Sequence, residues 1–226
     1  MEIKSTAKDL SKMFKTIGKL NKEVVIKAVG NELCCIVSDS GLCSIIDYKM
    51  KVATVTEGTL SVNIEKLDKI IKRFDGVITL SAEKDIVTIT DGSKVFNIPQ
   101  ISVVSEERIP VLTFSCMYAV DDSILSKIIE DSWATETDTT EFDAEGDTLI
   151  VRAGHEEIKM QQKVVCEVKT AAKKEVAKMA TELVENIIGI VDKLYLEIMT
   201  DCPLKITGEN DNIKLMCMIA PRVDSG

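Results

Sequence analysis

The chain has 226 residues, of which 45% are hydrophobic and 29% charged, and its formal net charge is -9. That length suffices for one large domain or two of about 110 residues, each able to bury a core. There is no run of about 18 apolar residues, and the N-terminal MEIKSTAKDL lacks the apolar segment of a signal peptide, so we expect an intracellular protein of the cytoplasm or nucleus. The acidic total argues against attraction to nucleic acid over the whole surface, but it leaves room for a local basic surface.

The first predicted helix, at about residues 7 to 21, has one basic and one apolar face. At about 100° per residue, five lysines fall on one narrow stripe: Lys8, Lys12, Lys15, Lys19 and Lys22. The opposite side carries five apolar side chains: Leu10, Met13, Phe14, Ile17 and Leu20. Residues 1–22 hold six lysines against Glu2 and Asp9, so positive charge gathers at this end of an acidic chain. A solvated helix face is the simplest interpretation of one such helix, and recurrence on other helices would weaken it.

Three further stretches have helical period and length: about 63–74, 122–133 and 170–187. The second predicted helix again carries cations opposite its apolar side: Lys66, Lys69, Lys72 and Arg73. Lys127 lies opposite the apolar side of the third, and Lys174 and Lys178 do so more loosely on the fourth. A fold that turns these helices toward one surface would collect the cations there.

The rest of the chain is a series of short alternating or β-branched runs, such as EVVIKAV and KLYLEIM, separated by turn signals such as TDGS and GENDN. These features predict many short antiparallel strands. Placing residues 10–14 over residues 125–129, an offset of 115, aligns two helices that each precede strands. We therefore predict an α+β fold with two copies of one unit, a first domain at 1–98 and a second at 111–226, joined by a connector at 99–110.

Sequence motifs for catalysis or for a cofactor are missing. The phosphate-binding, dinucleotide-binding and nucleophile-elbow glycine motifs do not occur, and His155 is the only histidine. The seven cysteines mostly sit inside apolar runs and form no Cys-x-x-Cys, so we expect neither a metal nor a cofactor. The acidic run TETDTTEFDAEGD lacks the calcium-loop pattern and is best interpreted as a solvated loop. An enzyme acting on DNA stays open as a disfavoured alternative.

The C-terminal LYLEIMTDCPLKITGENDNIKLMCMIAPRV resembles the closing strands of the DNA sliding clamps of the proliferating cell nuclear antigen (PCNA) type. The resemblance rests on the pattern from Asp201 to Leu204 and on the Ala220-Pro221-Arg222 ending. CIVSDSGLCSIIDYKM similarly resembles the first-domain segment with an Asp-Ser pair, here Asp39-Ser40, and LSVNIEKLDKIIKRFDGVITLSAEKD resembles the helix and strand that follow. The resemblance covers essentially the whole chain.

The resemblance implies clamp domains that assemble into a ring, usually of three subunits, with antiparallel sheets outside and two helices per domain inside. It implies a non-enzymatic processivity factor that a clamp loader places on duplex DNA and that tethers polymerase and other replication and repair proteins. The lysine stripe would then face DNA phosphates without reading sequence. The implied DNA-facing residues are Lys8, Lys12, Lys15, Lys19, Lys66, Lys69, Lys72, Arg73, Lys127, Lys174 and Lys178. Glu130 stands where relatives usually carry a second basic residue.

The resemblance also implies a pocket for partner peptides and a subunit interface. The pocket positions are Leu42, Ile109, Pro110, Cys202, Pro203, Met218, Ala220 and Pro221, with Met218 where an aromatic residue is common. Core packing is the alternative for these eight. The interface would pair the edge strands at 93–99 and 155–162 of neighbouring subunits through Lys94, Val95, Phe96, Ile158, Lys159 and Met160, with Glu156 and Glu157 facing Lys94. A subunit of a mixed or checkpoint-like ring is the alternative to a homotrimer.

Overall fold

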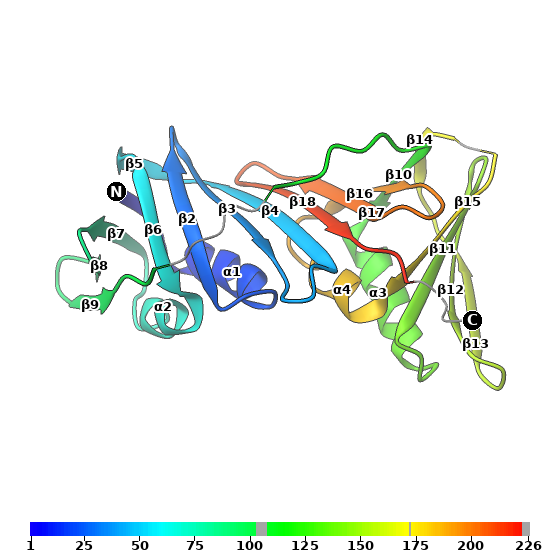
Figure 1. Ribbon diagram of the computed structural model, residues 1–226, viewed down its shortest axis with the longest axis horizontal. Helices are drawn as coiled ribbons and strands as arrows, with labels where there is room; N and C mark the ends of the chain where they lie inside the picture. The colour runs from blue at the N-terminus through cyan, green and yellow to red at the C-terminus, as the bar shows by residue number, and fades with distance from the viewer. Residues whose placement is uncertain (103–107, 172, 223–226) are drawn as a thin grey trace. The chain divides into compact units, whose positions relative to one another are not determined.

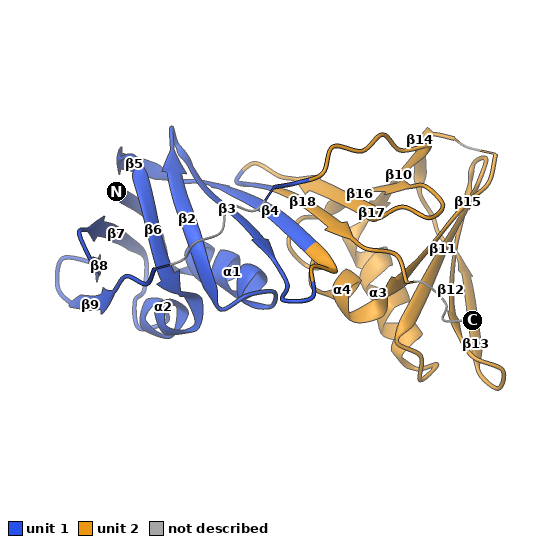
Figure 2. Cartoon of the chain, in the orientation of Figure 1, with its two compact units in different colours: residues 1–41, 45–109, 212–214 blue, residues 42–44, 110–211, 215–226 orange. Residues whose placement is uncertain are grey.

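The computed structural model describes residues 1–102, 108–171 and 173–222 (Figure 1). The chain forms two compact units, coloured separately in Figure 2. Unit 1 comprises residues 1–41, 45–109 and 212–214, and unit 2 comprises residues 42–44, 110–211 and 215–226. Residues 103–107 of the predicted connector lie outside the described residues. No helix in the described ranges is long and apolar enough to cross a membrane.

Unit 1 contains two helices and two sets of antiparallel strands. Its first set has the order β5-β1-β7-β8-β9, and its second has the order β4-β3-β2-β6. The elements are β1 (Glu2–Thr6), α1 (Ala7–Gly18), β2 (Glu23–Val29), β3 (Glu32–Ser38), β4 (Ser44–Lys51), β5 (Ala53–Thr56), β6 (Gly58–Asn63), α2 (Ile64–Ile71), β7 (Val77–Glu83), β8 (Ile86–Thr90) and β9 (Val95–Pro99).

Unit 2 repeats this plan. Its strands have the orders β14-β10-β16-β17-β18 and β13-β12-β11-β15. The elements are β10 (Cys116–Asp121), α3 (Asp122–Trp133), β11 (Thr139–Glu145), β12 (Thr148–Gly154), β13 (Lys159–Lys163), β14 (Glu167–Thr170), β15 (Glu175–Ala180), α4 (Thr181–Glu185), β16 (Lys193–Ile198), β17 (Leu204–Glu209) and β18 (Ile213–Ile219).

The predicted duplication is confirmed by the helices and by the strand orders. Helices α1 and α3 are offset by 115 residues at both their first and last residues. When α1 is laid on α3, the two strand orders of unit 1 match those of unit 2 position for position. In this correspondence β9 is the counterpart of β18, and β4 is the counterpart of β13.

Each helix buries its apolar face and exposes its polar face. In α1 the buried side chains include Leu10, Met13, Phe14 and Ile17, at the spacing expected for one helical face. The Thr6 side chain caps α1 by accepting a hydrogen bond from the Asp9 amide at 3.1 Å. Asn63 caps α2 in the same way, by accepting from the Lys66 amide at 3.1 Å. The predictions of the first three helices are therefore confirmed, although α1 and α2 are shorter than expected.

The prediction of a fourth helix over 170–187 is wrong. Residues Glu175–Ala180 form strand β15, which pairs along its length with β11, and among the described residues of this stretch only Thr181–Glu185 is helical. Ala, Lys and Glu give this segment helical propensity, but Ala177 and Met179 alternate into the core as strand residues do. Sheet pairing outweighs local propensity here.

Two fully buried tyrosines differ in one hydrogen bond and provide a stability test. The Tyr118 hydroxyl donates to the Gly146 carbonyl at 2.9 Å, whereas the Tyr48 hydroxyl has no partner within the described part of the chain. A buried hydroxyl without a partner costs about 1–3 kcal/mol. We expect Tyr48→Phe to leave the free energy of unfolding unchanged or raise it, and Tyr118→Phe to lower it by about 1 kcal/mol in chemical denaturation. Equal destabilisation by both variants would contradict this difference.

Candidate nucleic-acid interface

Eight cations of unit 1 project from helices α1 and α2 or from the residues that directly follow them. All eight side chains are exposed: Lys8, Lys12, Lys15, Lys19, Lys66, Lys69, Lys72 and Arg73. The two helices pack against each other, so these cations belong to one helical layer (Figure 1). We call this set the unit 1 basic face. Exposed lysines on adjacent helices suit phosphate contacts, which need charge rather than a shaped pocket.

Asp68 joins the two helices beneath this face. Its carboxylate accepts a hydrogen bond from the Ser11 hydroxyl of α1 at 2.6 Å and forms an ion pair with Lys72. A second ion pair, 3.0 Å long, connects Lys22 to Glu65 at the start of α2. Lys72 is thus partly neutralised by a carboxylate of its own helix.

Unit 2 presents a different helical surface. Lys127 is exposed on α3 as predicted, but Lys174 and Lys178 do not lie on a helix. Lys174 precedes β15, and Lys178 lies within β15 opposite Glu141 of β11. The assignment of these two lysines to the helical surface is therefore wrong, and the cause is the strand that replaces the expected helix.

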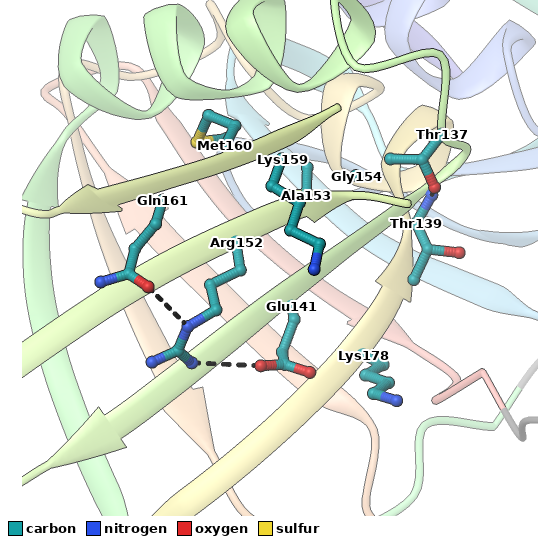
Figure 3. A pocket seen from close by; sticks show the side chains of 10 residues that line it. All are labelled: Thr137, Thr139, Glu141, Arg152, Ala153, Gly154, Lys159, Met160, Gln161 and Lys178. Carbon is teal, nitrogen blue, oxygen red and sulfur yellow. Dashed lines mark hydrogen bonds and ion pairs between the residues drawn. The ribbon is translucent and has the colours of Figure 1, made fainter. Parts of the chain in front are cut away.

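Lys178 instead lines a groove of about 430 Å³ on the strands of unit 2 (Figure 3). Arg152 crosses this groove and donates hydrogen bonds to Gln161 at 3.2 Å and to Glu141 at 3.1 Å. Hydrogen bonds to Asp143 and Glu141 raise the pKa of the Arg152 guanidinium. Its positive charge is therefore taken up by carboxylates of the same sheet and contributes little to anion binding.

The structure distributes the predicted partner-peptide residues over both units. Leu42 is 76% exposed and has a left-handed backbone with φ 55°, and Pro110 is also exposed. The Ala220 amide donates to the Cys43 carbonyl at 2.7 Å, which holds the Leu42 loop against the end of β18 within unit 2. Met218 is only 5% exposed. The remaining four are partly exposed: Ile109, Cys202, Pro203 and Pro221.

Arg222 anchors the C-terminal segment, a role that sequence reasoning missed. Its guanidinium pairs with both carboxylate oxygens of Asp138 at 2.5 and 2.6 Å, and its amide donates to the Lys178 carbonyl at 2.8 Å. This anchor positions Pro221 at the border of a groove of about 310 Å³. Arg222 and Asp138 are 84 residues apart in sequence, so no local sequence pattern predicts that they pair.

The predicted interface strands both end their sheets. β9 is the last strand in its five-stranded sheet of unit 1, and β13 is the last strand beside β12 in unit 2. Val95 is 62% exposed and Ile158 41%, so apolar side chains accompany both edges. Lys94 donates to the Arg73 carbonyl at 3.0 Å and stacks on Phe74 at 5.5 Å, which ties β9 to the end of α2.

Groups that could support chemistry other than binding include His155 and the cysteines. His155 lies in the turn before β13, where its ring nitrogen accepts a hydrogen bond from the Glu157 amide at 3.3 Å. Within the described ranges, no group of three or more His, Cys, Asp or Glu side chains could hold a metal ion. Burial raises the pKa of the Cys35 thiol to about 12, which makes it a poor nucleophile.

Comparison with known structures identifies this architecture. A. fulgidus PCNA, in a structure with the C-terminal region of FEN-1, matches with a TM-score of 0.87 and 16% identity over 100% of this chain and 99% of that one. This chain has the PCNA clamp fold. PCNA from Thermococcus kodakaraensis matches with a TM-score of 0.86 and 17% identity over 98% of this chain and 99% of that one.

A chain from the PCNA2–PCNA3 complex of Sulfolobus tokodaii also matches, with a TM-score of 0.82 and 20% identity over 98% of this chain and 99% of that one. No protein-family model and no curated protein matches the sequence. The PCNA clamp fold is thus established through structure, at a sequence identity where the fold carries over but residue roles do not.

The Arg222 anchor predicts a pH dependence. Hydrogen bonds from Arg222 hold the pKa of Asp138 below its usual range. A lowered carboxylate pKa stabilises the folded chain above the ordinary Asp pKa, and this contribution is lost as pH falls through the lowered value. We expect Arg222→Ala to return the pKa of Asp138 toward its ordinary value in an NMR titration, and Arg222→Lys to give an intermediate value. An unchanged pKa in Arg222→Ala would show that Arg222 is not its cause.

Proposed function

We propose that this protein is a DNA sliding clamp that encircles duplex DNA and tethers replication and repair proteins. The unit 1 basic face is the observation that carries the proposal, because the PCNA clamp fold here presents eight exposed cations on two packed helices. Contacts from lysine to phosphate carry no sequence information and allow movement along the duplex. We place the protein inside the cell, where a clamp loader and polymerases would act on it.

The clamp acts as a scaffold and not as an enzyme in this proposal. A. fulgidus PCNA is described with the C-terminal region of FEN-1 bound, which motivates a peptide site on this chain. The exposed Leu42 and the Pro221 segment, anchored by Arg222, are the positions we assign to it. The predicted pocket residue Met218 would act from beneath this surface, because it is nearly buried.

The proposal of ring closure rests on the two strands that end their sheets, β9 of unit 1 and β13 of unit 2. We propose that β9 of one copy pairs antiparallel with β13 of the next, since strand edges are ready to pair.

A mixed ring is the second candidate. The Sulfolobus tokodaii match is a complex of two different PCNA chains, PCNA2 and PCNA3, so this fold also occurs in unlike subunits. In that case β9 and β13 of this chain would each pair with a different protein. Self-pairing and pairing with another chain are distinguished by the cross-linking experiment below.

The first prediction concerns the basic face. Lys72 is left unchanged because it pairs with Asp68. Four other exposed lysines of the unit 1 basic face are suitable for reversal: Lys8, Lys15, Lys66 and Lys69. Exposed helix charges contribute only tenths of a kcal/mol, so the variant should fold and assemble normally. Within a Debye length of about 8 Å, however, reversed charges repel phosphates. We expect clamp-dependent primer extension at moderate salt to fall steeply, while partner-peptide binding stays unchanged.

The matched control reverses four exposed lysines on strands and turns: Lys4, Lys51, Lys84 and Lys214. It changes the net charge equally, so it should retain primer extension if position rather than total charge matters. Normal extension by a correctly assembled basic-face variant would refute the proposed function.

The second prediction concerns ring closure. Asn97 and Gln161 are the central residues of β9 and β13, so central antiparallel pairing brings them opposite each other. We expect Asn97→Cys/Gln161→Cys to form covalent oligomers, up to closed rings, under mild oxidation of the purified protein. Each single variant is a control for the seven native cysteines, of which Cys43 is exposed.

A homotrimer predicts cross-linked species of up to three chains in the double variant and none in either single variant. A persistent monomer without cross-links would reject self-pairing and favour the mixed ring. Light scattering of the unmodified protein provides an independent molar mass.

A further inference from the structure

The helical surfaces of the two units carry opposite charge. Counting each helix with the two residues after it, α1 and α2 hold eight cations against Asp9, Glu65 and Asp68. The same count for α3 and α4 gives one cation against five acidic residues: Asp122, Glu130, Asp131, Glu182 and Glu185. The net charge is therefore +5 for the helices of unit 1 and -4 for those of unit 2, although the two units share one topology.

The single cation of the unit 2 helices is surrounded by acidic side chains. Glu130 and Asp131 follow Lys127 at i+3 and i+4, so all three share one exposed face of α3. Helix α4 packs against α3 and adds Glu182 and Glu185, both exposed. The Glu185 carboxylate accepts a hydrogen bond from the Trp133 ring nitrogen at 3.1 Å, which keeps this charge beside the end of α3.

The helix dipole does not favour the acidic pair on α3. Glu130 and Asp131 lie in the last turn, where the helix dipole disfavours negative charge. Asp122 does have a local role, because its carboxylate accepts a hydrogen bond from the Gly189 amide at 2.9 Å. Their i+3 and i+4 spacing from Lys127 favours the helix only slightly, so Glu130 and Asp131 affect chiefly the field outside it.

We propose that the DNA contact of each subunit is confined to α1 and α2 of unit 1, and that the acidic surface of α3 and α4 repels the duplex. This inference rests on the proposed function, because it concerns the same DNA. Phosphates within about 8 Å of Glu130 and Asp131 would meet net repulsion that Lys127 does not offset. Each subunit therefore holds DNA through one domain, and the other domain keeps the duplex from settling on its helices.

The test measures binding of the assembled protein to a short fluorescent duplex by anisotropy at several salt concentrations. Each phosphate contact contributes about 0.9 to the slope of log affinity against log salt. We expect Lys15→Gln to lower both affinity and slope, and Lys127→Gln to lower them much less. Glu130→Lys/Asp131→Lys should raise affinity about tenfold and steepen the slope, because it adds cations where repulsion was present. The two introduced lysines lie in the last turn of α3, where the helix dipole favours positive charge, so the variant should fold.

Glu145→Lys/Glu209→Lys is the matched control, since it makes the same charge change at exposed residues at the ends of β11 and β17. The inference is overturned if this control raises affinity as much as the helix variant, or if Lys127→Gln weakens binding as much as Lys15→Gln. In both cases the loss caused by Lys15→Gln would still support the proposed clamp. Failure of Lys15→Gln to weaken binding, together with normal primer extension by the basic-face variant, would instead reject the clamp itself.

Discussion

Burial of the apolar faces of helices α1, α2 and α3 is the interaction on which the remaining surface depends. Leu10, Phe14 and Ile17 of α1, like Leu125 and Ile129 of α3, are essentially inaccessible to solvent. Burying such side chains gains about 1.5–3 kcal/mol each, far more than an exposed charge contributes. The apolar face therefore determines how each helix lies on its strands, and the charged face must point outward. Lysines on these helices are therefore exposed at the surface as a consequence of core packing.

Duplication makes the consequences of this rule visible within one chain. Both units use the same strand orders, and α1 and α3 begin and end at the same offset. The apolar faces of α1 and α3 pack on strands of the same order, whereas their exposed faces carry opposite net charge. Outward side chains are free to differ because they contribute little to folding. Equivalent positions in the two units can therefore serve different purposes, and a fold-level match alone does not say which unit contacts a ligand.

The sequence was sufficient to predict the features that depend on periodicity. Three helices and the repeat follow from apolar spacing and turn residues. The edge segments at 93–99 and 155–162 came from chain position and the family resemblance, and they contain the observed strands β9 and most of β13. The fourth helix was mispredicted because a strand with Ala177 and Met179 in the core contains good helix formers. Contacts such as Ser11–Asp68 and Asp138–Arg222 join residues 57 and 84 positions apart, and only the folded chain brings them together.

The two edge strands connect folding with assembly. An exposed edge with apolar side chains such as Val95 and Ile158 is a liability for a protein that stays monomeric, because its amides and carbonyls can pair with any strand. Charged side chains and proline commonly protect such edges, and β9 has Pro99 only at its last residue. Phe96 packs edge-on against Phe74 at 5.6 Å, which links β9 to the residues that follow α2. A sheet edge with exposed apolar side chains and little protection is better explained by pairing with another strand than by isolation.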